Sequence, residues 1–246
     1  MFVSKMTAHT LNRLSFPLIQ RSIRTVKPNI VVPTLFDRTR FRLGGGNLRY
    51  PMGQLHAAGE NMFAVCAEYP VFEDFVQRLN LPDNFQSWFS LTTLHIWMCL
   101  VRLRQEGVEG QLLKRTFVNL FWLDLRSRMR TFKILRKIHS QVSVFRMQFF
   151  GAIFAYDEGF LAHSDALLSA ALWRNLFLSS SSVTMEQLEL ALKYVRKNLA
   201  HLDDIPSPTI LRFGTPTFLS LTDDKVDPRF ATERLRYCVT WPSFIK

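Results

Sequence analysis

Apolar residues recur every three or four positions along most of the chain beyond residue 56, and this spacing predicts amphipathic helices. The expected helices cover residues 57–69, 71–80, 85–105, 110–151, 160–178 and 185–202. Pro70 separates the first two, and Gly107 follows the last turn of the third, where glycine commonly ends a helix. The pattern predicts an all-α fold, built as a single multi-helix domain.

The helix expected at residues 85–105 is apolar on more than one face. Large apolar side chains form one stripe along this helix, at Leu91, Leu94, Met98 and Val101. Further apolar side chains lie beside the stripe, at Trp88, Trp97 and Leu100. A helix that is hydrophobic over most of its circumference is covered by protein over most of its circumference. We therefore expect this helix at the centre of the domain.

Residues 110–151 have neither glycine nor proline between their two end positions, so they form one long helix or two abutting helices. The expected bend is at 140–144, where serine and β-branched residues lower the helix propensity. The apolar segment 149–156 begins inside this stretch and continues past its end. We expect this segment to belong to the core. It is too short to cross a membrane, which takes roughly 20 apolar residues.

Two further helices are expected near the end of the domain. The helix at 160–178 is predicted to turn four leucines inward: Leu161, Leu168, Leu172 and Leu176. Thr184 followed three residues later by Gln187 is a capping-box pattern, which predicts that the last helix begins at residue 185.

The flanking segments are predicted to lie outside this domain. Residues 37–56 contain Gly44, Gly45 and Gly46 without the Lys-Ser/Thr ending of a phosphate-binding loop, so they are interpreted as a flexible lead-in. Five prolines divide residues 204–246 into short pieces, which predicts an irregular, extended C-terminal tail. The helical domain is therefore placed at 57–203.

Charge indicates a targeting segment at the N-terminus. Residues 1–36 carry five basic residues and no acidic one, among several serines and threonines. Acid depletion of this kind is typical of a mitochondrial presequence, and the apolar positions are too interrupted for a secretory signal. A basic arm that stays in place and binds nucleic acid is the alternative.

Composition narrows the class of protein. The 246 residues are 48% hydrophobic and include 22 phenylalanines, which excludes disorder throughout. The three cysteines lie far apart in the sequence and form no CxxC motif, so we expect reduced thiols in an intracellular compartment.

The residues that could carry chemistry do not form a recognisable catalytic set. No zinc-protease, nucleophile-elbow, phosphate-loop or dinucleotide motif is present in the sequence. His95 lies among apolar residues and reads as a buried, hydrogen-bonded histidine. Asp157 and Glu158 are adjacent and point about 100° apart on a helix, so they read as structural carboxylates. We expect no enzyme activity, no cofactor and no metal site.

A basic stripe is the clearest candidate for a binding surface. Arg126, Arg130, Lys133 and Lys137 share one face of a helix, opposite the Phe/Leu stripe, and Arg128, Arg136 and Arg146 are expected to add to its positive potential. The stripe could meet ribosomal RNA, anionic lipid headgroups or an acidic protein. A solvated face with no partner is the alternative.

Four motifs resemble the ubiquinol–cytochrome c chaperone family: LTTLHIWMCLVRLR at 91–104, FWLDLR at 121–126, AYDEG at 155–159 and AALWRNLF at 170–177. Their order and spacing match the family over about residues 60–203. The positions that correspond to its motif residues are His95, Trp97, Arg102, Trp122, Asp124, Tyr156, Asp157, Glu158, Trp173, Arg174 and Asn175. Trp97, Trp122 and Trp173 are expected to be core or near-core residues.

The resemblance implies an α-helical, non-enzymatic assembly factor for respiratory complex III on the matrix side of the mitochondrial inner membrane. It implies a smaller assembly-factor subunit as partner, nascent cytochrome b as client, and a place near the mitoribosomal tunnel exit, with room for peripheral contact with the membrane. A mitoribosome-associated RNA-binding protein that acts through the basic stripe is the alternative, and an enzyme with an unrecognised site ranks below both.

Overall fold

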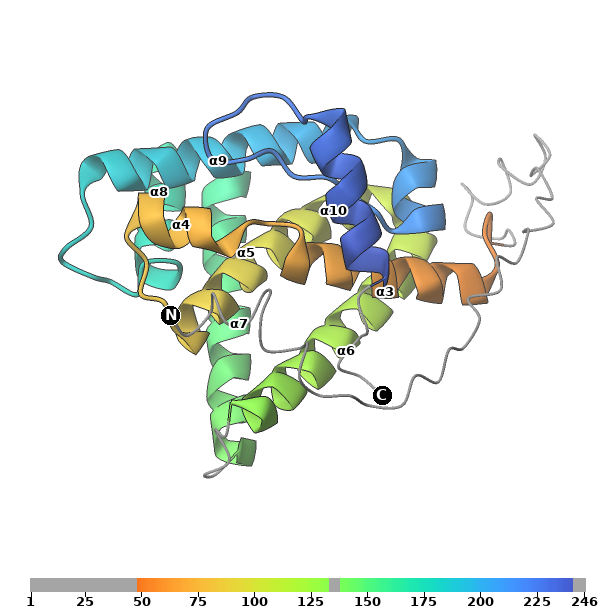
Figure 1. The fold of residues 1–246 in the computed structure, drawn as a ribbon, viewed down its shortest axis with the longest axis horizontal. Coiled ribbons are helices and arrows are strands. Elements are labelled where there is room, and N and C mark those ends of the chain that lie inside the picture. Colours follow the sequence, from red (N-terminus) through yellow and green to blue (C-terminus); the bar gives the residue numbers. More distant parts are fainter. Residues whose placement is uncertain (1–47, 133–137, 241–246) are drawn as a thin grey trace.

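The computed structural model describes residues 48–132 and 138–240 of the chain, and all regular structure in these ranges is helical, which confirms the all-α prediction (Figure 1). The helices are α3 (Met52–Glu68), α4 (Phe72–Leu79), α5 (Phe85–Leu103), α6 (Gly107–Thr131), α7 (Ile138–Leu161), α8 (Asp165–Asn175), α9 (Met185–Asp204) and α10 (Pro228–Thr240). A 3-10 turn at Arg104–Glu106 and a π-helical turn at Thr209–Phe213 complete the regular structure of these ranges.

Helix α5 occupies the centre of the fold, as its sequence predicts. It packs against α3, α6, α7 and α9, and nearly all its side chains are buried (Figure 1). The side chain of Asn84 begins α5 by accepting a hydrogen bond from the amide of Ser87 at 2.9 Å. Gly107 follows the 3-10 turn with a φ of 60°, so the chain turns there into α6.

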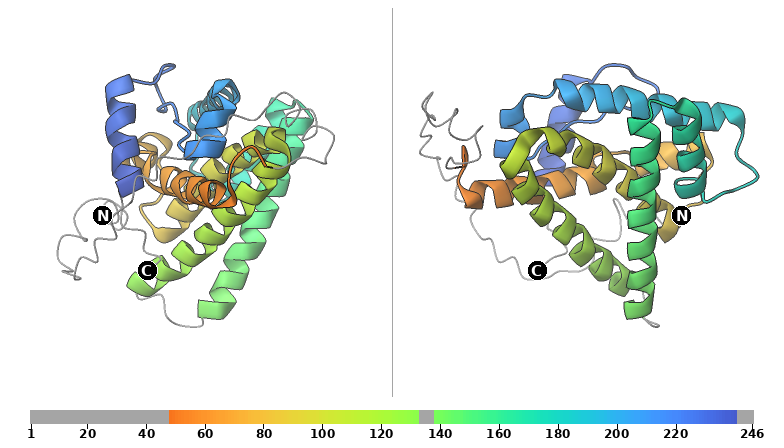
Figure 2. Two further views of the ribbon diagram at one scale, coloured as in Figure 1. Left: turned by 90° about the vertical axis from the view of Figure 1, so that its right-hand side faces the viewer. Right: turned by 180° about the vertical axis from the view of Figure 1, so that it is seen from behind.

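The long stretch after Gly110 forms two helices, but the predicted bend at 140–144 is wrong. Helix α6 ends at Thr131, and α7 runs without interruption from Ile138 to Leu161. The serines fit within α7, since the hydroxyl of Ser143 donates to the carbonyl of His139 at 3.1 Å. The two helices approach each other where α6 ends and α7 begins (Figures 1 and 2).

The helix predicted at 160–178 is shorter than expected. Helix α7 continues to Leu161, and α8 begins only at Asp165, after a turn in which His163 has a φ of 52°. The hydroxyl of Ser164 caps α8 by accepting from the amide of Leu167 at 3.2 Å. Because of this turn Leu161 is exposed rather than inward, whereas the other three predicted leucines of this segment are buried.

The N-terminal end of the domain extends into the predicted lead-in. Helix α3 begins at Met52, and the residues before it are attached to α6. Arg49 donates to the carboxylate of Glu109 at 2.6 Å, and the amide of Tyr50 donates to the same carboxylate at 3.0 Å. Glu109 is fully buried, so this ion pair orders residues that composition alone suggested were a linker.

The C-terminal segment is more regular than predicted. Residues 214–220 have no regular secondary structure, and Phe218, Leu219 and Leu221 in and just after this segment are buried, but α10 follows them. Pro228 stands at the first position of α10, where proline is favoured, and Asp227 accepts from the amide of Arg229 at 2.9 Å.

Helix α10 closes over α3. The guanidinium of Arg234 donates to the carbonyl oxygens of Glu68 and Tyr69 at the end of α3, so a cation lies at the negative end of that helix. All three cysteines are buried free thiols, and the sulfur atoms of Cys66 and Cys99 lie 3.5 Å apart.

Candidate functional site

Helix α7 presents a hydrophobic stripe to solvent, in addition to the stripe that it buries. Met147 is 69% exposed, Phe150 60%, Phe154 73% and Leu161 67%, at spacings that place all four on one side of the helix. Phe149, Ala152 and Tyr156 are buried on the other side. The prediction that 149–156 belongs to the core is therefore correct for one face of α7 and wrong for the other.

The helix pair α6 and α7 has no exposed acidic side chain between positions 110 and 156, and the exposed Glu158 lies one turn beyond Phe154 on the same side of α7. Asp124 is the one acidic residue between positions 110 and 156, and it is buried. Exposed cations in the described part of the same helix pair are Lys114, Arg115, Arg130 and Arg146. Lys114 and Arg115 lie near the beginning of α6, whereas α6 approaches α7 at its other end. We call Arg130, Arg146 and the exposed side chains of Met147, Phe150 and Phe154 the α6–α7 surface.

The predicted basic stripe lies partly on this surface. Arg130 is exposed and Arg126 is half-buried, whereas Lys133 and Lys137 lie outside the described residues. Arg128 was expected to add to the positive potential, and that prediction is wrong. Its guanidinium is buried between two carboxylates: it donates to Asp124 at 2.6 Å and to Glu68 at 2.5 Å.

The Glu68–Arg128–Asp124 cluster joins α3 to α6. Burial alone would lower the pKa of Arg128, but Asp124 and Glu68 hold it above its ordinary value, so the guanidinium stays charged. The guanidinium also lies 4.7 Å from the ring centre of Trp88 on α5. Asp124, a family-motif residue, therefore has a structural role in the core.

Two other motif residues also tie helices together. Arg102 donates to the carbonyl oxygens of Leu202 and Ile205 at 3.0 Å each, and to Glu106 at 2.6 Å, so α5 holds the C-terminal end of α9. The indole of Trp97 donates to one carboxylate oxygen of Asp157 at 2.9 Å.

Asp157 and Glu158 do not act as a pair, as expected from their spacing. The second oxygen of Asp157 accepts from Arg104 at 2.6 Å, so its carboxylate faces α5, whereas Glu158 is exposed. The two carboxylates therefore share no substrate site.

His95 is a buried structural histidine, which confirms the interpretation of the sequence. Its Nδ1 lies 2.8 Å from the carbonyl oxygen of Leu91, so Nδ1 carries the proton, and Nε2 accepts from the hydroxyl of Tyr194 at 2.6 Å. Burial lowers the pKa of His95 to about 4. The ring is neutral at physiological pH.

The tryptophan predictions are correct for two of the three residues. Trp97 is fully buried and Trp122 is 8% exposed, but Trp173 is 39% exposed. The indole of Trp173 donates to the carbonyl oxygen of Ser180 at 3.0 Å, in the loop after α8. The buried face of α8 is formed by Leu168, Ala171 and Leu172. Trp173 lies outside that face, next to the exposed Arg174.

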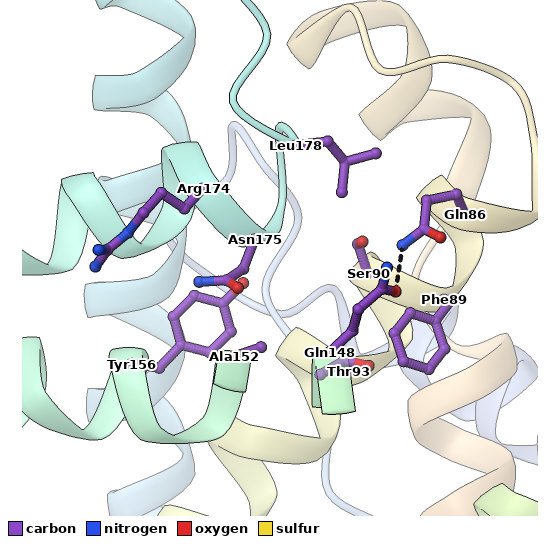
Figure 3. Close-up of a pocket in the computed structure, with 10 residues that line it drawn as sticks. All are labelled: Gln86, Phe89, Ser90, Thr93, Gln148, Ala152, Tyr156, Arg174, Asn175 and Leu178. Atoms are coloured by element: carbon purple, nitrogen blue, oxygen red, sulfur yellow. Dashed lines mark hydrogen bonds between the residues drawn. The ribbon is translucent and has the colours of Figure 1, made fainter. Parts of the chain in front are cut away.

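A cavity of about 120 Å³ lies between α5, α7 and α8 (Figure 3). Three motif residues line it, namely Tyr156, Arg174 and Asn175, together with residues of α5. Asn175 donates to the carbonyl oxygen of Ala171 at 2.8 Å. The sequence contained no signal for this cavity, because its lining comes from helices far apart along the chain.

The described residues contain no group of three or more potential metal ligands. Among the same residues, no helix combines the length and the hydrophobicity needed to cross a bilayer.

The sequence of this chain matches the family model described as Ubiquinol-cytochrome C chaperone over residues 77–218. The chain belongs to this family. The match covers more than half of the chain and includes all four motifs, so the resemblance read from them is confirmed.

The names of similar proteins are consistent with membership of the ubiquinol–cytochrome c chaperone family. The chain is 38% identical over 170 residues to "Ubiquinol-cytochrome c reductase complex assembly factor 1" of Mus musculus, covering 69% of this chain and 57% of that protein. It is 32% identical over 163 residues to "Protein CBP3, mitochondrial" of Saccharomyces cerevisiae, covering 58% of this chain and 46% of that protein. The chain thus spans less than two thirds of the length of these two relatives.

A solved structure shares the fold. The crystal structure of the Cbp3 homolog from Brucella abortus superposes with a TM-score of 0.56 at 19% sequence identity, covering 79% of this chain and all of that one. At this identity the likeness concerns the helical architecture alone.

Proposed function

We propose that this ubiquinol–cytochrome c chaperone is a mitochondrial assembly factor for respiratory complex III, and that it acts by binding rather than by catalysis. The named relatives in mouse and yeast support a role in the assembly of complex III. We further propose that it receives newly made cytochrome b near the mitoribosomal tunnel exit, together with a smaller assembly-factor subunit, on the matrix side of the inner membrane.

The observation that carries the proposal is the α6–α7 surface. Exposed apolar patches of this kind mark sites of interaction with other apolar molecules. A nascent membrane protein presents apolar segments, and the exposed Phe and Met side chains of α7 are suited to bind them. The neighbouring cations would favour contact with the phosphates of ribosomal RNA or of lipid headgroups.

Replacing Phe150 and Phe154 by Asp tests the apolar part of the surface. Both side chains are exposed, so the double variant should melt close to the parent temperature. It should recover less radiolabelled cytochrome b in affinity isolations from mitochondria and should lower assembled complex III. The matched control combines Met52→Asp and Met185→Asp, which places the same two charges at exposed positions of α3 and α9. Equal recovery of cytochrome b by the double variant and the control would contradict the proposal.

Reversal of Arg126, Arg130, Lys133 and Lys137 to Glu tests the basic stripe. If these residues contact phosphate, the variant should sediment less with mitoribosomes, and association of the parent should weaken as salt rises. Unchanged ribosome association would refute the role of the stripe. A uniform fall in every mitochondrial translation product, rather than in cytochrome b, would favour the general RNA-binding alternative.

The proposed location rests on residues 1–36, which lie outside the described residues. Replacing Arg13, Arg21 and Arg24 by Glu should block import, since a presequence requires positive charge. Fluorescence localisation measures the outcome, and a variant that still reaches mitochondria would count against a presequence.

A further inference from the structure

The exposed side of α7 has the spacing of a coiled-coil seam, the stripe through which two helices pair. Two sets of residues alternate along it at intervals of seven: Met147, Phe154 and Leu161 in one set, and Val144, Gly151 and Glu158 in the other. All six residues are exposed, and we call them the α7 seam. In the view from behind, α7 runs along the near face of the molecule between α6 and α8 (Figure 2, right). The described residues supply no helix that covers this seam.

Gly151 has no role in packing within the described part of the chain. It lies in the middle of α7, and a Cβ built on it would meet no atom within 4 Å. Glycine makes a helix interior less stable than alanine does, so the domain gains nothing from it at this position. Its neighbours along the seam, Met147 and Phe154, project into solvent and are 69% and 73% exposed. A bare position beside a projecting ring is the hole that a side chain of a second helix fills.

A second copy of α7 in antiparallel orientation fits this seam. When Phe154 of one copy packs over Gly151 of the other, two-fold symmetry repeats the same contact with the copies exchanged. The seven-residue spacing then places Leu161 opposite Val144 of the second copy and Met147 opposite its Glu158. Each projecting ring therefore meets the one position of the seam that has no side chain.

The charges beside the seam favour the antiparallel orientation. Arg146 is exposed toward the beginning of α7, and Arg130 is exposed at the end of α6, which approaches α7 there (Figure 2). Glu158 is exposed at the other end of the seam. An antiparallel pair brings the cationic end of each copy to the level of the acidic end of the other, whereas a parallel pair places like charges side by side. The charge pattern of α7 is therefore complementary to its own reverse.

We propose that two copies of this chain pair through the α7 seam, in antiparallel orientation, when no client is bound. The pairing covers Met147 and Phe154, which belong to the surface assigned above to cytochrome b. The paired form is therefore a resting state, and the client displaces the second copy. This regulatory role rests on the proposed function, whereas the pairing itself does not.

Sedimentation equilibrium of the purified full chain over a range of concentrations tests the pairing. The parent should shift from monomer to dimer as its concentration rises. Phe154→Asp should weaken the association about tenfold or more, because it removes the central ring and adds two like charges close to the symmetry axis. The variant should melt like the parent, since Phe154 is exposed. Met185→Asp is the matched control: it places the same charge at an exposed position of α9 and should associate like the parent.

Introduced cysteines test the orientation, because the three natural cysteines are buried. A mixture of Val144→Cys and Leu161→Cys chains should form an intermolecular disulfide under mild oxidation, since the antiparallel pair sets these positions opposite each other. Val144→Cys alone should form none, because its two copies lie roughly 26 Å apart along an antiparallel pair, and a disulfide requires Cα atoms within about 7 Å. The parent is the control for the natural thiols.

Three results would each overturn the pairing. They are a parent that stays monomeric at every concentration, a Phe154→Asp variant that associates like the parent, and a disulfide formed by Val144→Cys alone. If the parent stays monomeric while the Phe150 and Phe154 double variant loses cytochrome b, the pairing is wrong and the proposed function stands.

Cells that express two differently tagged copies test the resting state. The second tag should be recovered with the first, but it should be absent from the fraction that contains radiolabelled cytochrome b. Recovery of both tags with cytochrome b would overturn the regulatory role, because the client would then bind without displacing the second copy.

Discussion

Arg128→Met should be among the most destabilising single substitutions in this chain. The change removes the cation that contacts the carboxylates of Asp124 and Glu68, which are 2% and 4% exposed. Breaking a buried ion pair by removing one partner costs about 3–5 kcal/mol, because a charge is left buried without compensation. For a chain of this size that loss lowers the melting temperature by about 6–20 °C.

The pH dependence distinguishes this cause from simple loss of packing. Burial raises the pKa of Glu68 and of Asp124, and Arg128 opposes the rise. Without Arg128 both carboxyl pKa values should rise further, so the folded variant binds more protons than the unfolded chain above pH 4. Its stability should therefore fall as pH increases from about 5 to 8, relative to the parent.

Urea denaturation followed by circular dichroism at pH 5 and pH 8 measures both effects. The matched control is Arg130→Met, which removes an exposed cation two residues further along α6 and should change stability by less than about 0.5 kcal/mol. If Arg128→Met unfolds at the same urea concentration as Arg130→Met, the argument from the buried cluster is wrong. If it is destabilised equally at both pH values, packing rather than charge is responsible.

Other substitutions separate buried from exposed positions. Trp97→Ala should lose about 3–5 kcal/mol in urea denaturation, whereas Trp173→Ala should lose much less because its ring is partly in solvent; equal losses would contradict these placements. NMR titration should find His95 neutral at pH 5.5. The pKa of His95 is lower in the folded protein than in the unfolded chain, so its contribution to stability should be lost as pH falls from about 6.5 to 4. Gly214→Ala should lower the melting temperature by several degrees, because Gly214 has a φ of 63° and a Cβ there would clash with the carbonyl oxygen of Ala58; an unchanged melting temperature would refute this.

The sequence by itself determined the helical class, the central helix and several helix ends. Each depends on interactions within a few residues, such as the 3.6-residue period of α5, the Asn84 cap and the Thr184–Gln187 capping box, which forms as predicted. It also identified the family, because four motifs in order are a property of the chain alone. The presequence and the limits of the helical domain remain predictions.

The tertiary structure decided which apolar and charged faces are covered. Helix α7 is hydrophobic on both sides, so its periodicity carried no information on which side packs against α5 and which meets solvent. Arg128 and Arg130 belong to the same basic stretch of the sequence. Arg128 is buried because Glu68 on α3 lies opposite it, whereas Arg130 is exposed. The cavity likewise arises only where α5, α7 and α8 meet. Burial depends on neighbours that are distant in the sequence, and local patterns do not encode those neighbours.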